Sequence, residues 1–364
     1  MSPDAPRTVR SLGVEAPGAP FYAEYREGPA GPGEIRLDLL FTGFSAGTEL
    51  TFLKGTNPYL HGRWDEGRGV FAPGDPSAHY PVPFLGYMEV AEVIASDAPG
   101  FGPGDVVATT FGHKTGHTAN PAHDLVVPLP RDLDPLLGIF VAQMGPIAAN
   151  GILHADAEAL GRPGGPLGAG IAGRPVGVWG GGTVGLLVAL FARRAGAEVL
   201  LAEPSPWRRD RAQGLGLEAL PEEEAWAEAK RRWHGPEGRG ADMVFQTRAR
   251  PESLALALKA LRPQGTVIDL AFYQGGLDAT RLGEEFHHNG LALRSAQISR
   301  VPRGFGALWD RRRLAAETIA LLRAEGDAIR RHLVTHVVPF DEGADFLRRL
   351  PEERPDFLQI VFAR

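Results

Sequence analysis

The chain of 364 residues contains no cysteine. That absence excludes disulfide bonds, thiol nucleophiles and every zinc site that uses cysteine ligands. Lysine is also scarce, so nearly all of the 38 basic residues are arginine; the lysines are Lys54, Lys114, Lys230 and Lys259.

A positive charge surplus and long apolar runs are missing too. The formal net charge is −6, which gives no general attraction to nucleic acid or to anionic membranes. No apolar run reaches the length that spans a bilayer, and the first ten residues, MSPDAPRTVR, contain no apolar signal core. We therefore expect a cytoplasmic protein without nucleic-acid or membrane partners.

The first 150 residues have the pattern of a β-rich domain, and the chain is long enough for two domains. Residues 33–41 and 83–93 alternate between apolar and polar side chains, and β-branched runs follow at 105–109 and 124–128. Residues 55–82 are rich in Gly, Pro, Asn and Asp without periodicity, which predicts a long loop.

After about residue 174 the pattern changes to strands that alternate with helices, which is typical of a parallel sheet covered on both faces. Strand patterns return near the carboxyl end, so the chain is expected to rejoin its first domain. The predicted domains are residues 1–149, 150–300 and 301–364. The expected strands of the parallel sheet are 176–179, 198–202, 243–245, 266–270 and 291–297, and its clearest helices are 183–195 and 252–261.

A glycine motif lies between the first of these strands and its helix. Residues 175–190 read PVGVWGGGTVGLLVAL, in which Gly180, Gly182 and Gly185 form G-x-G-x-x-G. These glycines permit a tight turn, close approach of a pyrophosphate and close helix–sheet packing. The amides near Thr183 and Val184 would face the phosphates. A flexible turn is the alternative, but the strand–helix context favours dinucleotide binding.

An acidic residue follows at the expected distance. Glu203 ends the second strand, where a carboxylate accepts the ribose hydroxyls of NAD and repels the 2′-phosphate of NADP. Ser205 and Arg208 follow it and would suit that phosphate, although Arg208 also fits a solvated helix face. The sequence thus favours NAD and leaves NADP possible.

The order of these parts resembles the medium-chain dehydrogenase/reductase superfamily. The resemblance covers nearly the whole chain and is strongest in GEIRLDLLFTGFSAGTEL and in PFLGYMEVAEVIASDAPGFGPGDVVATT. It implies an α/β protein with a GroES-like β-rich catalytic domain and a doubly wound Rossmann domain. SAGTEL, GYMEV, FGHK and FHHNGLALRSAQ look like a subgroup that contains bacteriochlorophyllide hydroxyethyl dehydrogenases and relatives labelled zinc-binding dehydrogenases.

The positions that hold zinc in this family carry other residues here. Zinc-dependent members have a cysteine in the first segment, a His-Glu pair after the glycine of the second, and a further cysteine before the dinucleotide domain. The matching residues are Ser45, Tyr87 with Met88, and approximately Met144. Because hydroxyls and thioethers are poor zinc ligands, no zinc is expected.

Without zinc, side chains would have to polarise the substrate and move the proton. The resemblance makes Tyr87, Thr48, Ser45 and His113 the catalytic candidates. For Tyr87 the alternative is an aromatic ring packed at a strand end. For Ser45 and Thr48 it is turn or helix-capping duty, and for His113 it is a plain surface histidine. A metal bound by His113, His117 or Glu49 also stays open.

Further expectations rest on the resemblance. Phe272 or Tyr273, after the fourth strand, would pack against the nicotinamide, and the strand around Arg294 would pair with a second subunit in a homodimer. The predicted function is zinc-independent, NAD(P)(H)-dependent hydride transfer with a small carbonyl or alcohol substrate, in a cleft between the domains. An NADPH-dependent enone or quinone reductase and a catalytically silent dinucleotide-binding protein are the alternatives.

Overall fold

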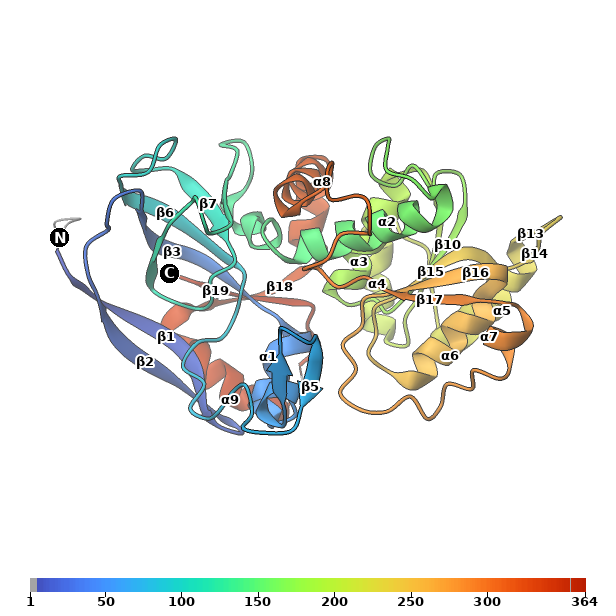
Figure 1. Cartoon of the computed structure of the whole chain (residues 1–364), viewed down its shortest axis with the longest axis horizontal. Helices are drawn as coiled ribbons and strands as arrows, with labels where there is room; N and C mark the ends of the chain where they lie inside the picture. The colour runs from blue at the N-terminus through green and yellow to red at the C-terminus, as the bar shows by residue number, and fades with distance from the viewer. Residues whose placement is uncertain (1–4, 354) are drawn as a thin grey trace. The chain divides into compact units, whose positions relative to one another are not determined.

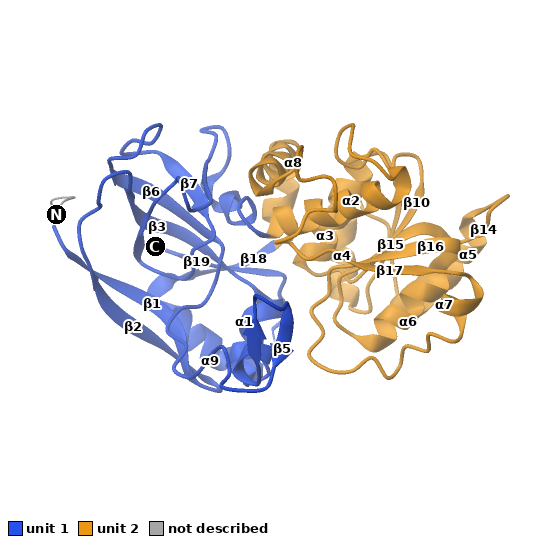
Figure 2. Ribbon diagram, in the orientation of Figure 1, with its two compact units in different colours: residues 1–143, 334–364 blue, residues 144–333 orange. Residues whose placement is uncertain are grey.

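The computed structural model describes residues 5–353 and 355–364 of the chain. They form two compact units, shown in different colours in Figure 2. Unit 1 comprises residues up to Gln143 together with Val334–Arg364, and unit 2 comprises Met144–Leu333. The carboxyl end therefore does return to the first unit, as the strand pattern at residues 337–339 and 360–362 predicts.

Unit 1 is built mainly on antiparallel strand pairs (Figure 1), and one pair of its larger sheet is parallel. A hairpin of β1 (Arg7–Ala16) and β2 (Ala19–Glu27) precedes a larger sheet whose central strand is β3. The apolar face of β3 is buried because its side chains alternate across the sheet. The order of the larger sheet is β18 (Val334–Pro339), β19 (Gln359–Ala363), β3 (Ile35–Phe44), β6 (Glu89–Ser96), β7 (Val106–Thr109) and β9 (Val126–Pro128), and β8 (Gly116–Ala119) also pairs with β3.

Unit 1 also contains short helices, 3₁₀ turns and a small hairpin. The helix α1 (Ala46–Lys54) follows β3 directly and ends at Gly55, which has a left-handed backbone with φ 72°. The expected loop 55–82 contains some regular structure: a 3₁₀ turn (Pro58–Leu60) and a hairpin of β4 (Arg63–Asp65) and β5 (Val70–Ala72). The remaining elements are the 3₁₀ turns Pro135–Phe140 and Phe340–Glu342 and the helix α9 (Gly343–Glu353).

Unit 2 contains a six-stranded parallel sheet (Figure 1). Its order is β12, β11, β10, β15, β16, β17, so the chain runs outward from β10 in one direction and then in the other. Ligands bind outside the carboxyl ends of the strands where such a sheet reverses. The bounds are β10 (Pro175–Trp179), β11 (Glu198–Ala202), β12 (Ala219–Leu220), β15 (Ala241–Gln246), β16 (Leu261–Asp269) and β17 (Ala292–Ser295), and a small hairpin pairs β13 (His234–Gly235) with β14 (Gly238–Arg239).

Helices cover this sheet. Helix α3 (Thr183–Arg194) forms where the sequence predicts a helix, and its residues 185–192 are all buried. Helices α2 (Met144–Leu160) and α5 (Glu222–Arg232) are not predicted from the sequence. Most of α2 is buried, so it carries no polar stripe that would mark a helical period. The bounds are α2 (Met144–Leu160), α3 (Thr183–Arg194), α4 (Pro206–Gly214), α5 (Glu222–Arg232), α6 (Pro251–Ala260), α7 (Glu285–His288) and α8 (Arg311–His332).

The predicted boundary at residue 301 needs correction. Helix α8 belongs to unit 2 and packs on α2. A Cβ at Gly145 would lie 2.1 Å from Thr318 Cγ2, so the two helices approach closely at a glycine. The second unit therefore extends to Leu333. His287 and His288 lie in α7.

Candidate functional site

The glycine loop has the geometry that each of its glycines requires. Gly180 adopts φ 108°, which side-chain-bearing residues rarely do. A Cβ at Gly185 would lie 1.8 Å from the Gly180 carbonyl oxygen, so the helix can start this close only with glycine there. Gly182 is the N-cap of α3, and a Cβ built on it would find its nearest neighbour, Arg208 Nη1, at 3.9 Å. Unlike the other two positions, Gly182 is therefore not required by the protein's own packing.

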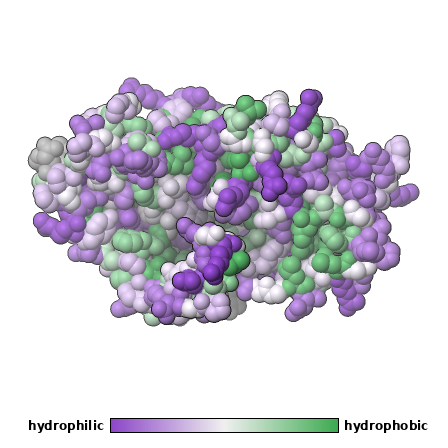
Figure 3. All heavy atoms as spheres, viewed as in Figure 1, coloured by the Kyte–Doolittle hydropathy of each residue, from purple (hydrophilic) through white to green (hydrophobic). Residues whose placement is uncertain are grey.

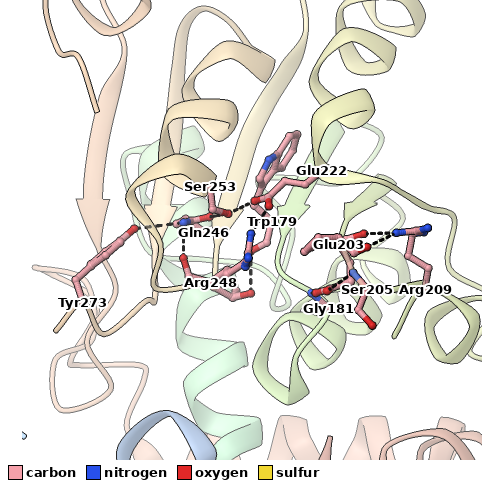
Figure 4. A network of polar contacts seen from close by, with 12 residues as sticks. Trp179, Gly181, Glu203, Ser205, Arg209, Glu222, Gln246, Arg248, Ser253 and Tyr273 are labelled. Carbon is pink, nitrogen blue, oxygen red and sulfur yellow. Dashed lines mark hydrogen bonds and ion pairs between the residues drawn. The ribbon is translucent and has the colours of Figure 1, made fainter. Parts of the chain in front are cut away.

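The carboxylate of Glu203 is fixed beside this loop (Figure 4). The side chain is 3% exposed; its Oε2 accepts from Gly181 N–H at 2.7 Å and its Oε1 from Ser205 N–H at 2.9 Å. Arg209 donates to the Glu203 carbonyl at 2.8 Å and so holds the strand end. The acid that the sequence predicts for ribose binding thus lies at the glycine loop.

Ser205 and Arg208, the residues that would suit the 2′-phosphate of NADP, lie at the start of α4. Ser205 is its N-cap, and the Ser205 side chain accepts from Arg208 N–H at 3.4 Å. The capping contact gives Ser205 a structural task. The guanidinium of Arg208 lies near the glycine loop, as its distance from Gly182 shows.

A polar network at the carboxyl ends of β15 and β16 was missed by sequence reasoning (Figure 4). Gln246 Nε2 donates to the Arg248 carbonyl at 2.7 Å and to Tyr273 Oη at 3.3 Å, and Arg248 forms an ion pair with Glu222. A Cβ at Gly180 would lie 3.0 Å from Arg248 Cβ, so this network adjoins the glycine loop. Its members come from three segments, around Glu222, Gln246–Arg248 and Tyr273, so no single motif marks the network.

The two aromatic candidates for the nicotinamide differ in their environment. Tyr273 Oη donates to Asp269 Oδ2 at 3.1 Å, and burial raises the pKa of Asp269 to about 6. Tyr273 is therefore tied to the end of the sheet. Phe272 is 43% exposed, so its ring is the accessible one of the pair.

In unit 1, three predicted catalytic residues form a hydroxyl cluster. Tyr87 Oη donates to Thr48 Oγ1 at 3.0 Å and is also hydrogen-bonded to Ser45 Oγ. Ser45 is the N-cap of α1, but its side chain makes no capping hydrogen bond, which leaves the hydroxyl for Tyr87. Burial raises the pKa of the Tyr87 hydroxyl. The expected strand starts only at Glu89, so Tyr87 lies in the segment that precedes β6.

The fourth candidate, His113, is linked to this cluster through hydrogen bonds made by Glu49. Its Nε2 lies 2.6 Å from Glu49 Oε2 and its Nδ1 lies 2.8 Å from Thr42 Oγ1. Glu49 Oε1 accepts from Ser45 N–H at 2.7 Å, so the pair reaches the start of α1. The alternative of a plain surface histidine is wrong, because His113 is 0% exposed. A Cβ at Gly86 would lie 2.8 Å from the His113 ring, which explains this glycine.

These residues do not fit a zinc ion. Ser45 and Tyr87, which the resemblance matches to zinc-ligand positions, present hydroxyls that are hydrogen-bonded to each other, and zinc prefers thiolate, imidazole or carboxylate. Glu49 and His113 are bound to each other, while His117 packs against Phe111 with ring centroids 3.6 Å apart. Within residues 5–353 and 355–364, no three His, Cys, Asp or Glu side chains gather as a metal site.

Residues 183–315 match the family described as zinc-binding dehydrogenase. D-guloside 3-dehydrogenase of Escherichia coli strain K12 is 23% identical over 359 residues, which cover 96% of this chain and 97% of that protein. 2-Dehydro-3-deoxy-L-galactonate 5-dehydrogenase of Pseudoalteromonas atlantica is 41% identical over 76 residues, which span 21% of this chain and only 22% of that relative.

Solved structures share the fold over nearly the full length. 2R,3R-butanediol dehydrogenase from Bacillus subtilis has a TM-score of 0.71 at 18% identity and covers 98% of this chain and 99% of its own. A protein described as a zinc-binding dehydrogenase from Sinorhizobium meliloti 1021, bound to NADP, has a TM-score of 0.68 at 19% identity and covers 98% and 100%. These likenesses confirm the predicted α/β fold.

Across the described residues, no helix has the length and apolar character needed to cross a bilayer. The parallel sheet with its glycine loop and the β-rich first unit are the two parts that the sequence resemblance predicts. The family that residues 183–315 match is likewise a dehydrogenase family. The chain as a whole has the fold of the alcohol dehydrogenases, and this fold and the family match together support its identification as an oxidoreductase.

Proposed function

We propose that this protein is a zinc-independent, NAD(H)-dependent oxidoreductase that transfers hydride between the nicotinamide and a small carbonyl or alcohol substrate. One observation carries the proposal. Tyr87, which the resemblance matches to a zinc-ligand position of the family, has its hydroxyl hydrogen-bonded to the hydroxyls of Ser45 and Thr48. A polar hydroxyl cluster thus replaces the metal where the family polarises its substrate.

The cofactor side of the proposal rests on unit 2. The amino end of α3, with Gly182, Thr183 and Val184, would hold the pyrophosphate, because helix N-termini favour anions. Glu203, held by Gly181 N–H, would accept the ribose hydroxyls. Phe272 would supply an apolar surface for the nicotinamide. When bound, NAD would accept the hydride from the alcohol, and NADH would supply it to the carbonyl.

The protonation of Tyr87 indicates how the cluster would act. Because burial raises the pKa of this hydroxyl, it stays protonated at neutral pH. A protonated hydroxyl can donate a hydrogen bond, and then its proton, to a carbonyl oxygen as hydride reaches the carbon. The partly exposed Thr48 would then take up a proton from solvent as it passes its own to Tyr87, so that every hydroxyl ends the step neutral. Ser45 would orient the Tyr87 hydroxyl during this transfer. His113 and Glu49 would keep Ser45 in place.

The substrate class follows from the relatives. D-guloside 3-dehydrogenase and 2R,3R-butanediol dehydrogenase carry names that specify secondary alcohols. We therefore propose a secondary alcohol, such as a sugar derivative or a diol, and the corresponding ketone. The test is a spectrophotometric panel of such alcohols with NAD and of ketones with NADH. Binding of NADH without turnover on any of them would support the silent cofactor-binding protein instead.

The rival reductase reading also has an observation in its favour. Arg208 Nη1 lies 3.9 Å from a Cβ built on Gly182, which places a guanidinium near the expected nucleotide. An NADPH-dependent enone or quinone reductase would use that charge for the 2′-phosphate and would need no metal. Calorimetric titration with NADH and NADPH distinguishes the NAD(H)-dependent dehydrogenase from the NADPH-dependent reductase. We expect tighter binding of NADH, because the Glu203 carboxylate is fixed beside the glycine loop.

We also propose that the protein forms a homodimer through β17. This strand is at the end of the six-stranded sheet, and edge strands with exposed apolar residues tend to pair with another chain. Figure 3 shows hydrophobic residues gathered over unit 2. Leu293, on β17, is 40% exposed. Light scattering of the wild type and of Leu293→Asp tests the proposal, because the charge should yield monomers.

A further inference from the structure

Three exposed aromatic side chains gather on the segment 55–82, which the sequence predicts as a long loop. Phe71, on β5, lies at their centre: its ring centroid is 5.6 Å from that of Tyr59 and 5.1 Å from that of Trp64. Tyr59 is 40% exposed, Trp64 37% and Phe71 51%, and we call the three residues the aromatic cluster. Contiguous exposed apolar surface of this kind is often a binding surface in soluble proteins.

The backbone holds the rings of the aromatic cluster in place. Strands β4 and β5 pair so that Trp64 lies directly opposite Phe71. Trp64 N–H donates to Ser77 Oγ at 2.8 Å, and the Tyr59 carbonyl accepts from Ala78 N–H at 2.8 Å. The rings therefore form a surface that exists before any ligand arrives, which lowers the entropic cost of binding.

Hydrogen bonds connect the aromatic cluster to the hydroxyl cluster within unit 1, where β5 and α1 are neighbours (Figure 1). Asn57 Oδ1 accepts from Tyr59 N–H at 3.0 Å, and Asn57 Nδ2 donates to Thr51 Oγ1 at 2.7 Å. Thr51 Oγ1 donates to the carbonyl of Thr48, whose hydroxyl accepts from Tyr87. Thr48 lies about 10 Å from the carboxyl end of α1, at 1.5 Å per residue. A ligand that contacts both clusters must therefore be longer than a small diol.

The charge and the size of this surface favour a small neutral ligand. The hairpin of β4 and β5 carries two arginines and two carboxylates, whose charges cancel: Arg63, Arg68, Asp65 and Glu66. An aromatic side chain has about 150–250 Å² of surface, so three that are about half exposed offer less than about 400 Å². A stable protein interface needs about 800 Å² from each partner. The aromatic cluster is thus too small to hold a second protein by itself.

A ring with an apolar face is the chemical group that this surface fits. The C–H groups of a sugar ring carry partial positive charge that the negative face of an aromatic ring attracts, and an aromatic aglycone can stack on the same face. Tyr59 and Trp64 also carry polar tips, Oη and Nε1, that can bond hydroxyl groups around such a ring.

We propose that the aromatic cluster binds the second ring of a neutral glycoside whose sugar ring carries the secondary alcohol. The reaction at that sugar ring rests on the proposed function, whereas the binding of the second ring does not. The second ring would anchor the ligand on the side of Tyr59, Trp64 and Phe71, while the sugar ring reaches the hydroxyl of Tyr87.

The test compares ligands that differ in the second ring. The probes are methyl and phenyl β-D-glucosides, methyl and phenyl D-gulosides, and cellobiose, in which the second ring is a sugar. Isothermal titration calorimetry in the presence of NADH measures their binding. Oxidation of 2R,3R-butanediol and of the glycosides with NAD measures the reaction separately.

The variants remove or keep one ring at a time. Phe71→Ala and Trp64→Ala each remove a ring of the aromatic cluster, while Phe71→Tyr keeps an aromatic face. Phe84→Ala is the matched control, because Phe84 is also 51% exposed in unit 1 but packs against Tyr25, with ring centroids 5.9 Å apart. Thermal melting confirms that each variant is folded.

We expect at least one phenyl glycoside to bind at least about fivefold more tightly than its methyl counterpart, because a ring pair contributes an amount of this order beyond buried area. Phe71→Ala and Trp64→Ala should remove this preference, whereas Phe71→Tyr and Phe84→Ala should keep it. Cellobiose that binds as tightly as the phenyl glucoside would identify the second ring as a sugar. Weaker binding of cellobiose would identify it as an aromatic aglycone.

Equal binding of phenyl and methyl glycosides, or a preference that survives in both alanine variants, would overturn the proposal. A wild-type dimer that Phe71→Ala dissociates in light scattering would assign the aromatic cluster to a second copy of the chain and would also overturn it. If butanediol is oxidised while the two glycosides bind equally, this inference fails and the proposed function stands. If the phenyl preference is present but no alcohol is oxidised, the binding surface stands and the proposed reaction fails.

Discussion

His113 Nε2 lies 2.6 Å from Glu49 Oε2 in the interior of unit 1, and the other oxygen of Glu49 accepts the backbone N–H of Ser45. The pair therefore connects a buried imidazole to the first residue of the hydroxyl cluster. Both side chains are almost fully inaccessible, so His113 acts on the cluster through Glu49 and is a positioning residue in the proposed mechanism.

Replacing His113 with alanine should destabilise the protein by about 2–5 kcal/mol, because it leaves the Glu49 carboxylate buried without its partner. His113→Gln keeps a donor within reach of Glu49 and should recover part of the stability and of kcat. Chemical denaturation and steady-state kinetics provide the two measurements. Full activity in a folded His113→Ala protein would remove His113 from the positioning role.

Tyr87→Phe should lower kcat at least about tenfold with NADH affinity unchanged, because only the donating hydroxyl is removed. Tyr22→Phe is the matched control, since Tyr22 also loses a buried hydroxyl in unit 1, one that donates to the Phe340 carbonyl. The control should lose stability and keep kcat. If both variants keep full turnover, Tyr87 is a packing residue.

Gly182→Asp should weaken NADH binding at least about tenfold, because it sets a carboxylate against the pyrophosphate at the start of α3. The melting temperature should not fall, since a Cβ at Gly182 has room and aspartate is a good N-cap. Gly185→Ala offers the contrast: its Cβ would clash with the Gly180 carbonyl and lower stability. Unchanged NADH affinity in Gly182→Asp would place the nucleotide elsewhere.

Glu89 should make stability depend on pH. The side chain is fully buried; its Oε2 accepts from Thr109 Oγ1 at 2.6 Å, and burial raises its pKa from 4.5 to about 7. The folded protein therefore binds the proton more tightly than the unfolded chain. Its contribution to stability is complete below pH 4.5 and is lost as pH rises through about 7.

Relative to Glu89→Gln, the wild type should lose up to about 3 kcal/mol of unfolding free energy between pH 4.5 and pH 8. Lys114, Arg7 and Glu27 interact electrostatically with Glu89 and are present in both proteins, so their own titration largely cancels in the difference. Urea denaturation across this pH range measures it. Parallel pH profiles for the two proteins would contradict the prediction.

Zinc removal should have no effect on activity, because the former ligand positions in unit 1 carry hydroxyls. Dialysis against EDTA, followed by elemental analysis and assay, checks this expectation. Activity that disappears with EDTA and returns with zinc would contradict it, and Glu49 and His113 would then be the first residues to examine as ligands.

Local patterns were sufficient where neighbours in sequence determine the structure. The expected strand 198–202 is β11, and the helix expected at 183–195 is α3, because apolar spacing and the glycine motif lie within one segment. The hairpin of β1 and β2 was not predicted, and the helix α2 was hidden by burial on most sides. Their form depends on packing partners that are distant in sequence.

The sequence by itself determined the parallel sheet, the glycine loop with Glu203, and the absence of any cysteine ligand. Only the tertiary structure decided that His113 is a buried partner of Glu49, 64 positions away, and that Tyr87 bonds Ser45 across 42 positions. A motif depends on residues that are close together in sequence. These contacts form only when segments that are far apart in sequence come together in the folded protein.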